Sequence, residues 1–164
     1  MICKLLNGKF QAVDMSFQLM QNGNKVDVFE YINHYLALHP GVEVHIGCDS
    51  QNYQSHTLYV MAVVFRHPGD GAHVLYRKEK VRKIDDLWTK LWGEIERSVN
   101  LANDIYATCN IKVAQIDLDY NSDPSFPSNK LLSAATGYAQ SLGFIAKAKP
   151  ELLMAAWAAN VLCH

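Results

Sequence analysis

The chain has 164 residues, of which 49% are hydrophobic and 19% are charged, and its formal net charge is -1. This length and composition are typical of one soluble globular domain. We expect a single domain over residues 1–164, with residues 1–41 as an N-terminal extension that contains a helix and residues 42–162 as the core. A net charge near zero neither supports nor excludes nucleic-acid binding, so any phosphate-binding surface has to be a local patch.

The four cysteines are scattered and form no Cys-x-x-Cys pair, which argues against structural zinc and favours reduced thiols. No secretion signal is recognisable, and no stretch approaches the roughly 20 apolar residues of a membrane span. We therefore expect a cytoplasmic protein that does not associate with membranes.

Caps, turns and periodicity predict the first half of the chain. Turn signals occur at Asn7-Gly8 and Asn22-Gly23, in an N-terminal segment that is otherwise ambiguous. Asp27 should cap a helix that ends at His39-Pro40-Gly41. Three strands joined by short turns should follow, which favours an antiparallel arrangement. They are predicted at residues 42–48, 58–66 and 72–83.

The second half alternates helices and strands. Asp85 or Asp86 should cap a long helix whose apolar stripe extends from Ile84 to Tyr106. Strands are then predicted at 111–118 and 143–146, and helices at 130–142 and 150–162. Strands joined through helices favour parallel pairing, so the predicted fold class is α/β, with a mixed five-stranded sheet flanked by helices.

Carboxylates follow two of the predicted strands. Asp49 comes directly after the first of the three antiparallel strands, at the start of a polar loop. Asp117 and Asp119 lie two residues apart at the end of the fourth strand, so they share a face. Glu94 lies at the border of the apolar stripe on the long helix, from where it can point along the sheet. A charge at the rim of a core is costly unless it is solvated, paired or bound to a metal, so these acids suggest a cluster for divalent metal ions.

Each acid also has a structural interpretation. Asp49-Ser50-Gln51-Asn52 is typical of a turn. Glu94 could be a boundary side chain that reaches water, and water alone could screen Asp117 from Asp119.

A basic row occurs on the third predicted strand. Lys78, Lys80 and Arg82 share one face of it and could follow a phosphate backbone. The same pattern protects an edge strand against aggregation, so both interpretations stay open. No phosphate-binding glycine loop and no Gly-x-Ser-x-Gly motif is present, which leaves a nucleophilic triad unsupported.

The order of the elements and acids resembles the ribonuclease-H-like plan, and several motifs resemble the YkuK-like family of ribonuclease-H-like proteins. Ile46-Gly47-Cys48-Asp49-Ser50-Gln51 is similar to the Ile-Gly-Thr-Asp-Ser-Gln signature of that family. Residues 91–98 around Glu94 resemble its helix motif. The resemblance covers roughly residues 25–162, and its remaining landmarks are Asp117-Leu118-Asp119-Tyr120-Asn121, Ser128-Asn129-Lys130, Gly137-Tyr138, Gly143-Phe144 and Lys149-Pro150.

The resemblance implies a ribonuclease-H-like fold and a two-metal nuclease site. In such a site Asp49, Glu94 and Asp119 would hold two Mg²⁺ or Mn²⁺ ions, with Asp117 as the competing choice for the third ligand. The resemblance also implies a fourth acid on the last helix, where this chain has Asn160. An asparagine can coordinate a metal through its carbonyl, but it removes one negative charge.

Two functions are therefore expected from the sequence. The first is a metal-dependent nuclease that hydrolyses RNA, DNA or a hybrid of the two. The second is a catalytically weakened module that binds nucleic acid or a protein partner without turnover. Contacts with nucleic acid are expected from Ser50, Gln51, Lys78, Lys80 and Arg82.

Overall fold

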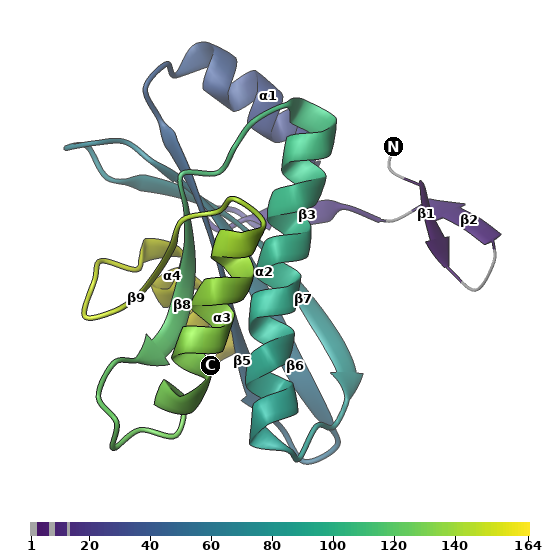
Figure 1. The fold of residues 1–164 in the computed structure, drawn as a ribbon. Helices are drawn as coiled ribbons and strands as arrows, with labels where there is room; N and C mark the ends of the chain where they lie inside the picture. The colour runs from purple at the N-terminus through teal and green to yellow at the C-terminus, as the bar shows by residue number, and fades with distance from the viewer. Residues whose placement is uncertain (1–2, 7–8, 13) are drawn as a thin grey trace.

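The computed structural model describes residues 3–6, 9–12 and 14–164. Within these residues a separate two-stranded hairpin, one seven-stranded mixed sheet and four helices are present (Figure 1). The elements are β1 (Cys3–Leu6), β2 (Lys9–Ala12), β3 (Ser16–Leu19), β4 (Lys25–Asp27), α1 (Val28–Leu38), β5 (Glu43–Asn52), β6 (His56–Arg66), β7 (Ala72–Arg82), α2 (Leu87–Cys109), β8 (Gln115–Asn121), α3 (Asn129–Ser141), β9 (Ala146–Lys149) and α4 (Met154–Cys163).

The large sheet has the strand order β4-β3-β7-β6-β5-β8-β9. Strands β5, β6 and β7 are antiparallel neighbours, whereas β8 is parallel to β5 and β9 is parallel to β8. The predicted mixed α/β sheet is therefore confirmed, but the predicted number of five strands is wrong. Strands β3 and β4 extend the sheet beyond β7, because Phe17 and Leu19 of β3 are buried in the core.

The N-terminal turn signals have different outcomes. Asn22-Gly23 lies in the connection between β3 and β4, where Gly23 adopts a positive φ of 73°. Asn7-Gly8 lies outside the described residues. The predicted caps are confirmed, since the Asp27 carboxylate accepts hydrogen bonds at the start of α1 and Asp86 does so at the start of α2.

Strand β5 is longer than predicted. It continues to Asn52, because Asp49 to Asn52 pair with Val60 to Thr57 of β6. Asp49 therefore lies inside a strand, and the prediction that it begins a polar loop is wrong. Side chains alternate along a strand, so Ser50 faces α2 while Asp49 faces α4.

The helices cover both faces of the sheet. Helices α2 and α3 lie together in front of the strands in Figure 1, and α4 lies behind them. Helix α4 packs mainly on β5 and β6, where it closes a smaller hydrophobic cluster of its own. None of the helices in the described part of the chain is long and apolar enough to cross a membrane.

Candidate functional site

Asp49 lies on the α4 side of the central strand β5. Its side chain is half-buried, and its Oδ2 accepts a hydrogen bond of 2.9 Å from Nδ2 of Asn160. Burial raises the pKa of the Asp49 carboxyl above its ordinary value, and the charge of Asp119 adds to this rise. The hydrogen bond from Asn160 acts in the opposite direction and favours the carboxylate.

Glu94 lies on the other side of β5, on helix α2. Its side chain is buried, and its Oε1 accepts a hydrogen bond of 2.5 Å from Oγ of Ser50. Burial raises the pKa of Glu94 well above its ordinary value, and the charges of Asp49 and Asp119 raise it further. Asp49, Glu94 and Asp119 therefore interact electrostatically, although they come from three separate elements.

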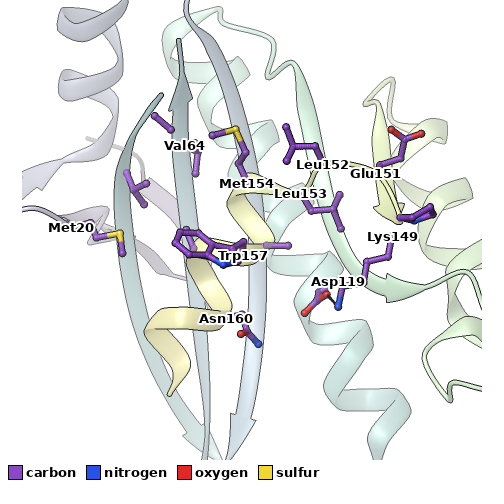
Figure 2. Close-up of a pocket in the computed structure, with 15 residues that line it drawn as sticks. Met20, Val64, Asp119, Lys149, Glu151, Leu152, Leu153, Met154, Trp157 and Asn160 are labelled. Atoms are coloured by element: carbon purple, nitrogen blue, oxygen red, sulfur yellow. Dashed lines mark ion pairs between the residues drawn. The ribbon is translucent and has the colours of Figure 1, made fainter. Parts of the chain in front are cut away.

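Asp119 connects the two sides of the sheet. It lines a narrow crevice together with Glu94, and it also lines a larger groove together with Asn160 of α4. Its Oδ1 forms an ion pair of 2.5 Å with Nζ of Lys149 at the end of β9 (Figure 2). Among the predicted acids, Asp119 is thus the one that faces both environments.

Asp117 has a structural task that the sequence did not reveal. It is 1% exposed, and its Oδ2 accepts hydrogen bonds of 2.7 and 3.2 Å from the backbone N–H groups of Ala155 and Ala156. These groups lie in the first turn of α4 and have no partner within the helix, so Asp117 caps the helix from a neighbouring strand. Its Oδ1 accepts a further hydrogen bond from Gln115. Both oxygens of Asp117 are therefore occupied by partners within the fold.

Gly47 explains how α4 comes so close to β5. A Cβ atom at this position would lie 2.5 Å from the backbone N of Ala156 and 2.6 Å from the backbone C of Ala155. The helix contributes small buried residues to the same contact, among them Ala155 and Ala159. The close packing brings Asn160 within hydrogen-bond distance of Asp49.

The predicted nucleic-acid contacts occupy different surroundings. Lys78, Lys80 and Arg82 are exposed on β7. Side chains alternate along a strand, so these three residues lie on the same face of β7 as Val74 and Tyr76, and the residues between them face α2. Val74 and Tyr76 pack beside α4. The basic row therefore lies on the α4 face of the sheet. Its contact with nucleic acid stays a prediction.

The other two predicted contacts lie further inside. Ser50 is buried and bonds to Glu94, and Gln51 is half-buried in β5. Their binding of nucleic acid also stays a prediction.

A comparison with known families decides where the chain belongs. A family model described as "Ribonuclease H-like" matches residues 27–163. The chain is a member of the ribonuclease-H-like family. This confirms the YkuK-type resemblance of the motifs. Neither the curated proteins nor the solved structures that were compared with the chain gave a match.

Ribonuclease-H-like proteins generally use divalent metal ions, so the candidate site should contain side-chain atoms that can bind such an ion. The carboxylate oxygens of Asp49, Glu94 and Asp119 have the hard-donor chemistry that Mg²⁺ and Mn²⁺ prefer. Within residues 14–164, however, no three acidic, histidine or cysteine side chains have the spacing of a formed metal site. The donor chemistry fits a divalent ion, whereas the side chains are engaged with Ser50 and Lys149.

The sequence did not single out two residues that the structure brings to this region. Lys149 contacts Asp119, and Trp157 lines the groove beside it. Lys149 was recognisable as a basic residue and as part of the Lys149-Pro150 landmark, but not as a partner of Asp119. Trp157 belongs to an alanine-rich helix whose outward face depends on how the helix packs.

Proposed function

We propose that this ribonuclease-H-like protein is a divalent-metal-dependent nuclease that uses Asp49, Glu94 and Asp119. One observation carries the proposal: Asp119 lines a crevice with buried Glu94 and a groove with Asn160, whose amide donates a hydrogen bond to Asp49. Carboxylates that lie close together repel one another, and groups of acids with perturbed pKa values are common at functional sites. A cation between the three carboxylates would relieve this repulsion.

The protein's own residues would prepare the site. Asn160 holds the Asp49 carboxylate by its amide, and Ser50 holds Glu94 by its hydroxyl. Asp117 and Gly47 fix the helix that carries Asn160. Bound Mg²⁺ or Mn²⁺ would supply a Lewis acid and lower the pKa of a water molecule, and Asp49 and Asp119 are the residues that would hold it, with Glu94 beside them.

The test is cleavage of labelled RNA, DNA and hybrid oligonucleotides with Mn²⁺ or Mg²⁺ by the wild type, Asp49→Asn, Asp119→Asn and Glu94→Gln. Because a metal ion stabilises the transition state by several kcal/mol, each variant should lose about 100-fold or more in rate. Glu96→Gln is the matched control, since Glu96 is exposed on the same helix two residues away. The proposal is wrong if the wild type cleaves no faster than an Asp49→Asn variant.

A binding module without turnover is the second candidate function. Two observations favour it: Asn160 replaces an expected acid and bonds to Asp49, and Lys149 neutralises Asp119. This candidate predicts salt-dependent binding of nucleic acid that does not change in an Asp49→Asn variant. Binding and cleavage measured on the same variants separate the two functions.

A further inference from the structure

A groove of about 840 Å³ extends from Asp119, one of the candidate carboxylates, across α4 (Figure 2). One end is polar and contains Asp119, Lys149, Glu151 and Asn160. The walls are largely apolar and include Val64 of β6 and Leu153, which precedes α4. The groove is therefore continuous with the proposed catalytic site, while most of its lining suits an uncharged, flat group.

Trp157 gives this groove an exposed aromatic surface. Its side chain is 64% exposed, although α4 otherwise presents buried alanines to the sheet. In Figure 2 the indole projects from the same helix as Asn160, one turn earlier. An indole stacks on the faces of nucleobases irrespective of their sequence.

Positive charge on this face of the sheet comes from Lys149, which lines the groove, and from a basic row on β7 outside the groove lining. Lys149 lies at the polar end of the groove and is about half exposed. The exposed row of Lys78, Lys80 and Arg82 lies on β7, on the face that α4 covers further along the strand. A phosphate backbone requires such cations, and its bases require an apolar surface beside them.

We propose that the groove binds an unpaired base of a single-stranded nucleic acid, which stacks on Trp157 while the backbone passes Lys149 toward Asp119. This inference rests on the proposed function and specifies its substrate class. In a duplex the base faces are stacked on one another, so an indole reaches them only after unstacking. Single strands are therefore the preferred ligand.

The experiment measures binding without catalysis. Anisotropy titrations in EDTA compare a labelled 12-nucleotide single strand with the same sequence as a blunt duplex, for the wild type, Trp157→Ala and Trp157→Phe. Loss of one stacked base should weaken single-strand binding about five- to 100-fold in Trp157→Ala, whereas Trp157→Phe should retain most of it. Trp88→Ala is the matched control, because Trp88 is also exposed but lies on α2, away from the groove.

The outcomes separate this inference from the proposed function. Binding of single strands that depends on Trp157, without any cleavage in Mn²⁺, supports the groove and refutes the nuclease. Asp49-dependent cleavage that Trp157→Ala leaves unchanged supports the nuclease and refutes the groove. Equal affinity for single strand and duplex, or a Trp157-dependent dimer in sedimentation with no oligonucleotide binding, also overturns the inference.

Discussion

Gly47→Ala should destabilise the protein although it adds only one methyl group. The new Cβ would lie 2.5 Å from the backbone N of Ala156, where an ordinary contact is 3.4–4 Å, so α4 or β5 has to shift by about 1 Å. Backbone atoms cannot rotate out of the way as a flexible side chain can. Overpacking of a rigid contact costs about 3 kcal/mol, which in a protein of this size lowers the melting temperature by roughly 6–12 °C.

Thermal unfolding followed by circular dichroism measures this effect, and the chain contains a matched control. Gly137 lies in α3, and a Cβ added there would have no atom within 4 Å. Gly137→Ala should therefore raise stability by about 1 kcal/mol, because alanine is the better helix former. Opposite signs are expected for the same chemical change at two glycines.

The reasoning would be refuted if Gly47→Ala melted at the wild-type temperature. It would also be refuted if Gly47→Ala and Gly137→Ala shifted the melting temperature in the same direction. The first result would mean that α4 does not pack on β5 as closely as the structure shows.

Three further predictions concern the acids and their partners. Glu94 holds its proton more tightly in the folded protein, so in EDTA the free energy of unfolding should fall as the pH rises from the ordinary glutamate pKa through the raised pKa of the folded state. Glu94→Gln should flatten this fall and be more stable than the wild type at pH 7, as urea titrations at several pH values can show. Asp117→Ala should lower the free energy of unfolding by about 1–3 kcal/mol in the same titrations, because it removes the cap of α4 and leaves two buried N–H groups unpaired. Asp119→Asn should lower it by less. Asn160→Asp should lower the melting temperature in EDTA, because the new carboxylate repels Asp49, and Mn²⁺ should restore the melting temperature. The same lowering of the melting temperature with and without Mn²⁺ would contradict a metal site there.

The sequence predicted what depends on local chemistry. Asp27 and Asp86 cap their helices as expected, because a cap involves only residues within three positions of each other. Four predicted strands overlap β5, β6, β7 and β8 for a similar reason, since their β-branched and aromatic runs are distinctive. The strand predicted at 143–146 shares only Ala146 with β9, whose sequence Ala-Lys-Ala-Lys contains no β-branched or aromatic residue. Strands β3 and β4 were not predicted to join the sheet, because they are short and reach it only where Gln18 and Leu19 of β3 pair with β7, which is distant in sequence.

The site could be predicted only in part. The motif around Asp49 indicated an acid at the centre of the sheet, but the sequence could not show that β5 continues through Ser50 and turns its hydroxyl toward Glu94. The choice between Asp117 and Asp119 depends on where the backbone of α4 begins. Contacts of this kind join residues 38 or more positions apart in the sequence, so no local sequence pattern predicts them.

The ion pair between Lys149 and Asp119 means that the chain carries its own competitor for a metal ion. Because the ammonium group is tethered, it stays near Asp119 at a high effective concentration, and a metal ion at Asp119 has to displace it. A substrate phosphate that draws Lys149 away would strengthen metal binding, and the metal would strengthen phosphate binding by the same factor. Under the proposed function, metal ion and nucleic acid would then bind cooperatively through a single lysine that exchanges one partner for the other.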